Sequence, residues 1–243
     1  MIKELGRVKA LFRYPVRSMA GEQLESVRVG PHGFETDRRL ALFYVGGGET
    51  LRRLKAEQLP QLVRYKPLSK DGGGPDDLPT HTITPDGREL ALQGEQLRGE
   101  LSAAYGSRLQ MMRVEGAEIP EAGISLIGVP TIKLFERSIG KSLSPRQFRP
   151  NMLIETRGGN AFEEEGWLGR VIKLGAGAEA PSIRITMRNR RCRIVNIDLE
   201  TGAEDTRVLK TVMLMNNKYA GIYASVVRTG TVTVGDALLV EQA

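Results

Sequence analysis

The chain of 243 residues contains a single cysteine, Cys192, so no intrachain disulfide can hold its fold together. The fold must therefore be stabilised by burying apolar side chains in a core. Hydrophobic residues make up 40% of the sequence and charged residues 26%, which is the balance of an ordinary soluble globular protein. A chain of this length forms one large domain or two modest ones.

The residues around Cys192 are strongly basic, because it lies in segment 188–193, which reads RNRRCR. Nearby guanidinium groups stabilise a thiolate and lower the pKa of the thiol. A thiolate is a good nucleophile and a good ligand for a soft metal. We therefore expect Cys192 to be functional, and the competing interpretation is that it is a small buried core residue.

The charge balance, the histidines and the N-terminal residues indicate which binding partners and which cellular compartment to expect. A net charge of +6 favours anionic partners. Several classes of anionic partner carry phosphate groups, so the charge alone does not identify one of them. The two histidines, His32 and His81, do not lie in a zinc-binding spacing, and one cysteine cannot complete a Cys/His zinc site. The N-terminal residues lack the apolar run of a secretory signal, and charges interrupt every hydrophobic segment. We therefore expect a cytoplasmic protein.

The first half of the chain predicts a mainly β structure. Between residues 49 and 62 the leucine spacing predicts a short helix, whose length Pro60 limits. The pattern weakens between Met112 and Glu121, and we expect the junction between two domains at residues 118–123. Strands are predicted from β-branched, aromatic and alternating positions at Arg7–Tyr14, Glu25–Val29, Arg38–Val45 and Leu62–Leu68.

The second half adds helices to a β framework. Pro130–Ile139 has a helix start at its proline and a stop at Gly140, and Glu204–Met215 predicts a second helix. Thr231–Val234 and Ala237–Val240 predict a closing hairpin. Further strands are predicted at Asn151–Glu155, Val171–Leu174, Ile183–Arg188 and Arg193–Ile197. The fold class expected for the whole chain is mainly β with a few helices (α+β).

Arginines recur at predicted turns, where they could clamp an anion. A guanidinium donates two parallel hydrogen bonds to phosphate, and a neighbouring hydroxyl such as Ser18 can add a third. Each arginine taken alone is more often a solvated surface residue. A base-stacking surface for nucleic acid is not supported, because aromatic residues are only 5% of the chain and none interleaves the arginines near Cys192. The arginines at turns are Arg17, Arg38, Arg39, Arg146 and Arg149.

Several motifs in sequence together resemble the MOSC family, named for the C-terminal domain of molybdenum cofactor sulfurase, in its two-domain form with an N-terminal β-barrel. The resemblance covers nearly the whole chain and rests on the order and spacing of the motifs. They are YPVRSMAGE at 14–22, GFETDR at 33–38, FRPN at 148–151, AFEE at 161–164 with Trp167, RC at 191–192 followed by Asp198 and Thr201-Gly202, and Gly235-Asp236.

The resemblance implies an N-terminal barrel-like domain at residues 1–115, a MOSC β-barrel domain at 116–243, and a molybdenum cofactor (a molybdopterin carrying molybdenum). By motif position Cys192 would be the molybdenum ligand, and Asp198 would shape the substrate side of the catalytic site. Arg17 stands where the family commonly has lysine. Val195, Asn196 and Leu199 also depart from the family pattern. The implied cofactor contacts are Arg17, Ser18, Arg38, Arg149 and Cys192.

The resemblance to amidoxime-reducing members of the family implies a molybdenum-dependent reductase that removes oxygen from N–O or S–O groups of small molecules. No ferredoxin-like cysteine spacing and no haem or flavin motif is visible, so a separate electron donor of ferredoxin, flavoprotein or cytochrome type is expected. Two other interpretations stay open. One is a non-enzymatic carrier of the cofactor or of a Cys192 persulfide, and the other is a basic nucleic-acid-binding β-barrel.

Overall fold

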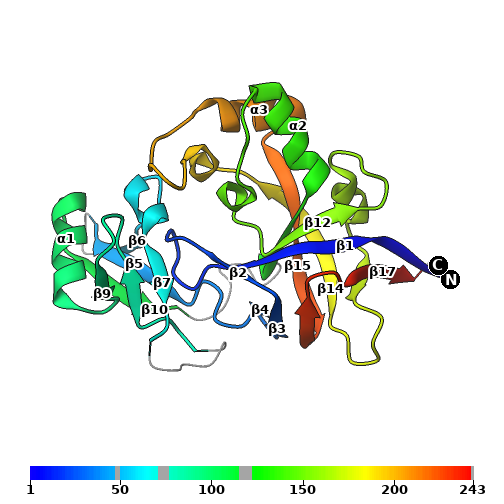
Figure 1. Ribbon diagram of the computed structural model, residues 1–243, viewed down its shortest axis with the longest axis horizontal. Helices are drawn as coiled ribbons and strands as arrows, with labels where there is room; N and C mark the ends of the chain where they lie inside the picture. Colours follow the sequence, from blue (N-terminus) through cyan, green and yellow to red (C-terminus); the bar gives the residue numbers. More distant parts are fainter. Residues whose placement is uncertain (47–49, 71–76, 115–121, 242–243) are drawn as a thin grey trace.

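The computed structural model describes residues 1–46, 50–70, 77–114 and 122–241, and it has two parts side by side (Figure 1). One part is built around a closed barrel, with helices α2 (Val129–Ile139) and α3 (Arg207–Asn216) packed on its outside. The other part holds helix α1 (Glu95–Tyr105) at the far end of the molecule. None of the described helices is long and apolar enough to cross a membrane.

Seven strands close the barrel, because the sheet order β12-β11-β15-β14-β13-β17-β1 returns through a direct pairing of β1 with β12. All pairings around it are antiparallel except that of β11 with β12. The strands are β1 (Ile2–Arg13), β11 (Ile124–Gly128), β12 (Met152–Thr156), β13 (Val171–Leu174), β14 (Ser182–Arg190), β15 (Tyr219–Arg228) and β17 (Ala237–Glu241).

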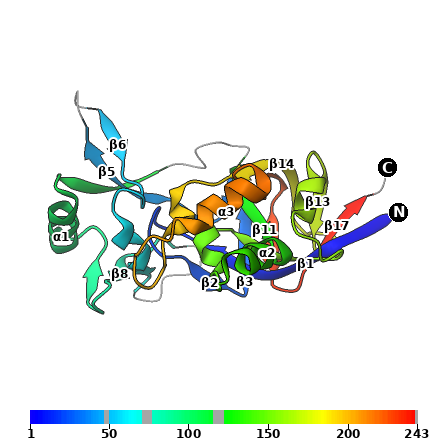
Figure 2. The ribbon, with the colours of Figure 1, turned by 90° about the horizontal axis from the view of Figure 1, so that it is seen from above.

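The barrel interior is filled by branched aliphatic side chains that alternate with outward-facing polar residues. In β14, for example, Ile183 and Ile185 are fully buried while Arg184 is exposed, as the two-residue period of a strand requires. A second apolar cluster lies outside the barrel wall, where Phe135 of α2 and Val212 of α3 pack with Phe148. The helices therefore cover one side of the barrel, as Figure 2 shows from above.

The other part consists of small sheets around its own core. Helix α1 covers this core with Leu97 and Leu101. Strand β10 (Leu109–Arg113) pairs with β5 (Leu40–Val45), which pairs with β6 (Leu51–Arg53). A second sheet contains β7 (Lys66–Leu68), β8 (His81–Ile83) and β9 (Glu89–Ala91). The sheet of β16 (Gly230–Thr233), β3 (Ser26–Gly30) and β4 (Gly33–Phe34) packs instead against the barrel, because its buried side chains belong to the barrel core.

The two parts are interwoven rather than strung in sequence. Strand β1 comes from the N-terminal region yet completes the barrel of the C-terminal region, and β2 (Glu22–Leu24) pairs with it. Strand β3 likewise pairs with β16. Ala56 and Val63 of the first region pack against Ile197 of the second. The expected domain boundary after residue 115 lies outside the described residues.

Four predictions about local structure were wrong in whole or in part. The leucines of 49–62 do not form one helix. Leu51 lies in strand β6 and is exposed, whereas Leu54, Leu59 and Leu62 come from the segment after β6 and from the 3-10 helix η1 (Pro60–Arg64) and share one core. Because Leu62 belongs to η1, the strand predicted at Leu62–Leu68 is restricted to β7. Arg193–Ile197 is not a strand, since Arg193–Asn196 form the 3-10 helix η5. The predicted closing hairpin is absent, because β16 pairs with β3 while β17 pairs with β1 and β13.

The other predicted elements are present with shifted ends. The helices predicted at Pro130–Ile139 and Glu204–Met215 are α2 and α3, and the strand predicted at Val171–Leu174 is β13. Helix α1 was missed, because only Leu97 and Leu101 mark its buried face and Gly99 interrupts the helical pattern.

Candidate functional site

The site begins where β1 ends and the chain turns through Tyr14–Met19. This turn is held by backbone bonds to the segment that carries the second motif: Arg38 N–H donates to the carbonyl of Tyr14 at 2.8 Å, and Arg17 N–H donates to that of Leu40 at 2.8 Å. The carboxylate of Asp37 accepts the N–H of Tyr14 at 2.7 Å. Two motifs from different parts of the first forty residues are thereby joined, which places Arg17, Ser18 and Arg38 in one region.

Arg38 is fixed by partners from both regions of the chain. Its guanidinium is paired with Asp37 and donates to Asn151 Oδ1 at 3.2 Å and to the carbonyl of Arg149 at 2.9 Å. Burial opposes the charge on Arg38, but the Asp37 carboxylate outweighs it, and the pKa of Arg38 is raised. Asn151, only 1% exposed, also accepts the N–H of Ser125 at 3.0 Å. The FRPN motif is therefore bonded directly to the GFETDR motif.

Arg149 lies against the ring of Tyr14, with its guanidinium carbon 4.3 Å from the ring centre. Arg38 lies near the same ring, at 5.0 Å. Arg149 donates to the carbonyl of Met19 at 2.7 Å, so it also fixes the turn that carries Arg17 and Ser18. Burial and repulsion from Arg38 lower the pKa of Arg149 to about 10.

Arg191, next to Cys192, is 7% exposed and donates to the carbonyls of Ala220 at 2.7 Å and Phe148 at 2.6 Å. Burial lowers its pKa to about 10, and Arg38 adds repulsion. Burial and repulsion from Arg53 and Arg38 likewise lower the pKa of Arg17 to about 10. We name the arginine cluster as Arg17, Arg38, Arg149 and Arg191.

Within the described part of the chain, Arg38, Arg149 and Arg191 place three positive charges close together, and the Asp37 carboxylate is paired with one of them, Arg38. All four guanidinium groups remain charged near neutral pH, and Asp37 is the carboxylate that acts on Arg17, Arg38 and Arg149. The other bonds of Arg38, Arg149 and Arg191 described above are to neutral carbonyl and amide oxygens. Concentrating like charges in a buried region costs free energy, which a bound anion would offset.

A buried hydroxyl supports the same conclusion. Tyr14 is 1% exposed, and its hydroxyl has no hydrogen-bond partner within the described part of the chain. Burial raises the pKa of Tyr14 to about 12, so it stays a neutral donor. A buried donor beside guanidinium groups fits an acceptor with several oxygen atoms. The donor set of this region therefore matches an anionic, oxygen-rich group such as a phosphate.

Three of the predicted cofactor contacts have left-handed backbone conformations: φ is 69° at Ser18, 55° at Arg38 and 47° at Arg149. Residues with a Cβ rarely adopt this region, at a cost of about 1 kcal/mol or more each. Such strain persists where surrounding contacts determine the conformation, and it concentrates at functional sites. Contacts with the rest of the fold therefore hold these three residues in backbone conformations that they would not favour on their own.

Cys192 differs from the expectation drawn from its neighbours. It is exposed, and its pKa is raised rather than lowered, because desolvation and a hydrogen bond to Glu57 outweigh the attraction of Arg191. The neighbouring arginines act elsewhere: Arg188 pairs with Glu165 at 2.8 Å and Arg193 with Glu204 at 2.9 Å. Without a metal the thiol is therefore protonated at neutral pH, and metal binding would release that proton.

Asp198 organises a loop. Its Oδ1 accepts the backbone N–H of Glu200 at 3.1 Å and both the N–H and the hydroxyl of Thr201 at 3.0 Å. These bonds lower the pKa of Asp198, with Lys141 3.9 Å away adding attraction. The bonds to Asp198 described here are thus within its own loop, and its expected role on the substrate side stays a prediction.

The sequence reasoning missed five residues that complete the site. Tyr14, Asp37, Asn151 and Arg191 lie inside motifs that were noted, but their roles depend on contacts across the fold. Glu57 comes from the segment assigned to a helix, and nothing in its local sequence marks it. The described residues contain no group of three or more His, Cys, Asp or Glu side chains that could hold a bare metal ion.

The fold and site define a two-part β protein in which a closed barrel and a smaller β region share a partly buried arginine cluster beside an exposed thiol. The chain belongs to the MOSC family: the model of the MOSC domain matches residues 114–239, and that of the MOSC N-terminal beta barrel domain matches residues 5–119. The expected mainly β fold with an N-terminal MOSC barrel domain is thereby confirmed.

Among solved structures, the YuaD protein from Bacillus subtilis is similar over 100% of both chains, with a TM-score of 0.55 and 12% sequence identity. YiiM from Geobacillus stearothermophilus matches 50% of this chain and 55% of its own, with a TM-score of 0.39 and 15% identity. The likeness to YuaD supports the fold alone. No curated protein matches the chain.

Proposed function

We propose that the protein is a molybdenum-cofactor-binding oxidoreductase that reduces N–O or S–O bonds of small molecules. The observation that carries the proposal is the arginine cluster with the orphan hydroxyl of Tyr14, joined through Arg191 to the thiol of Cys192. A cofactor of this kind has both an anionic phosphate and a metal that prefers sulfur ligands. Membership of the MOSC family also supports binding of this cofactor.

Each part of the site would have a separate task. Arg17, Ser18, Arg38 and Arg149 would hold the anionic end of the cofactor, and Arg191 would offset charge next to Cys192, the molybdenum ligand. The cofactor, when bound, supplies a metal that accepts an oxygen atom with a two-electron change of oxidation state. Overall, the reduction of an N–OH group consumes two electrons and two protons and releases water. We propose that a separate ferredoxin, flavoprotein or cytochrome supplies the electrons in the cytoplasm.

The test compares the wild-type protein with Cys192→Ala, both produced in a host that makes molybdenum cofactor. Molybdenum is measured by mass spectrometry and pterin by fluorescence. We expect near-stoichiometric molybdenum in the wild type and a loss of at least tenfold in the variant, with similar thermal unfolding because Cys192 is exposed. Absence of both molybdenum and pterin from the wild type would contradict the proposal.

A second measurement separates the reductase from a carrier of cofactor or sulfur. A reductase keeps its cofactor through gel filtration and oxidises reduced viologen when given an N-hydroxylated substrate. A carrier releases the cofactor and gives no turnover with any donor. Turnover in the wild type that is abolished in Cys192→Ala would favour the enzyme.

A further inference from the structure

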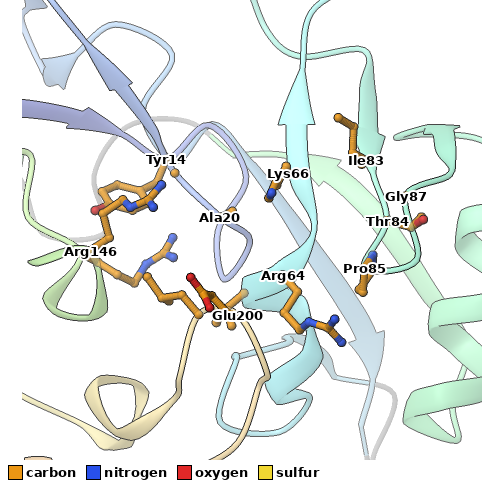
Figure 3. Close-up of a pocket in the computed structure, with 14 residues that line it drawn as sticks. Tyr14, Ala20, Arg64, Lys66, Ile83, Thr84, Pro85, Gly87, Arg146 and Glu200 are labelled. Atoms are coloured by element: carbon orange, nitrogen blue, oxygen red, sulfur yellow. The ribbon is translucent and has the colours of Figure 1, made fainter. Parts of the chain in front are cut away.

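A cavity of about 420 Å³ lies between the two parts of the molecule (Figure 3). Its walls come from the segment after β1, from η1 and β7, from the turn after β8, and from the loops around Arg146 and Glu200. Among the described residues, its lining includes none of Arg17, Ser18, Arg38 and Cys192. The cavity is therefore separate from the thiol and shares only Tyr14 and Arg149 with the site described above.

The cavity is lined by more cations than anions. Arg64, Lys66, Arg146 and Arg149 line it, with Glu200 as the acidic residue. In Figure 3 Lys66 and Arg146 approach from opposite walls. These two side chains, and Arg64, have no carboxylate within ion-pair distance in the described part of the chain, where Arg64 donates to Gln61 at 3.1 Å.

Several arginines elsewhere in the described part of the chain form ion pairs with carboxylates. Arg88, for example, is paired with Asp86 and Glu100, and Arg228 with Glu179. The cations of the cavity are thus available for an external anion. Two basic side chains that face one another across a cavity repel, and a ligand with several anionic oxygens would remove that repulsion.

Most of the remaining lining is apolar, with Thr84 as a polar exception. Val63, Ile83, Pro85 and Leu199 contribute to it together with Tyr14. The position of Tyr14 is fixed, because its ring lies under Arg149 and against Gly21. A bare inorganic ion would leave this apolar surface in contact with water, whereas a small molecule with an apolar body would cover it.

We propose that this interdomain cavity is a second binding site, for a small organic phosphate whose anionic group lies between Lys66 and Arg146 and whose apolar body covers Val63 and Leu199. The loop organised by Asp198 carries Leu199 and Glu200, so it forms one wall of this site. Glu200 opposes the bound anion and limits the affinity.

The test titrates the full-length protein with phenyl phosphate by calorimetry, and with inorganic phosphate and phenol as comparison probes. The cavity variant is Lys66→Gln with Arg146→Gln, and the matched control is Arg108→Gln with Lys210→Gln, which removes the same charge from exposed positions outside the cavity. Charged hydrogen bonds are worth enough that losing them should weaken phenyl phosphate binding about tenfold or more. Glu200→Gln should tighten it, a gain that a folding defect cannot produce.

The results expected are tighter binding of phenyl phosphate than of either comparison probe, a loss confined to the cavity variant, and weaker binding at high salt. The proposal is overturned if phenyl phosphate does not bind, if phenol or inorganic phosphate binds as tightly, or if the control loses as much affinity. A fall in molybdenum content in the cavity variant would assign the cavity to the cofactor instead. A wild type without molybdenum would overturn the proposed function, while phosphate affinity would still decide this proposal.

Discussion

The arginine cluster and the Cys192 thiol are connected through Arg191, yet they are built in opposite ways. The arginine cluster is largely buried, bonded across the fold and held in left-handed turns, so its geometry is determined by many contacts. Cys192 is exposed, and its thiol pKa is raised. The difference teaches that the protein fixes the position of charge in advance while leaving its single thiol accessible to solvent.

The largest effect should come from removing Arg38, which holds the arginine cluster together. Arg38→Gln leaves Asp37, with a side chain only 5% exposed, without its charged partner. Breaking a buried pair in this way costs about 3–5 kcal/mol. We expect that loss in urea unfolding, together with loss of bound pterin. Arg88→Gln, which breaks an exposed pair, should have a much smaller effect. Equal effects of the two substitutions would show that the arginine cluster is not specially constrained.

The next effect concerns the fixed ring of Tyr14. A Cβ at Gly21 would lie 2.4 Å from that ring, which is confined by Arg38 and Arg149. Gly21→Ala should therefore destabilise the protein by about 1–3 kcal/mol and lower its pterin content. Gly99→Ala is the matched control, because nothing lies within 4 Å of its Cβ and it sits in helix α1, where alanine should stabilise. Thermal unfolding of both variants checks the sign of each change.

A third prediction tests the exposed thiol of Cys192. Desolvation and Glu57 raise the pKa of the Cys192 thiol, so Glu57→Gln should lower that pKa and increase the thiolate fraction at pH 8. Alkylation of the cofactor-free protein by iodoacetamide should become faster by roughly two- to tenfold at that pH. The single cysteine makes the rate unambiguous. Glu89→Gln is the control, and an unchanged pH profile in Glu57→Gln would contradict the assignment.

The smallest effect on stability is expected at Asp198. Its pKa is lowered in the fold, so its contribution is present above the pKa of the unfolded chain and is lost as pH falls through the lower folded value. Asp198→Asn should remove this part of the acid sensitivity at a cost under about 1 kcal/mol. If the variant keeps full turnover with native cofactor content, Asp198 has no catalytic role and only organises its loop.

Prediction from the sequence was most successful where one short segment contains all the residues that determine its structure. Helix α2 has a proline start, an apolar face and a glycine stop within eleven residues, and all three can be read locally. The order of motifs likewise identified the family. The prediction of a closing hairpin was wrong, because β16 pairs with β3, some two hundred residues earlier in the chain. No pattern within the local sequence indicates that partner.

The same limit applies to the site. Motif positions placed Arg17, Arg38 and Arg149 in one region, and the structure brings them together. The state of Cys192 was predicted incorrectly, because charge near it in sequence was taken as charge near it in space. Arg188 and Arg193 are paired with Glu165 and Glu204 instead, and the carboxyl group that acts on the thiol belongs to Glu57.

Strand β1 gives this protein a particular order of events during synthesis. Its residue Ile2 is paired with Glu241, so the barrel cannot close while the ribosome is still adding the last strand. At a rate of about 5–20 residues per second, β1 waits roughly 10–50 s for this neighbour. The turn at Tyr14–Met19 follows β1 directly and is bonded to Arg149. A nascent chain therefore has no complete arginine cluster until Arg191 has been added, and any anion that the complete cluster binds can bind only after that point.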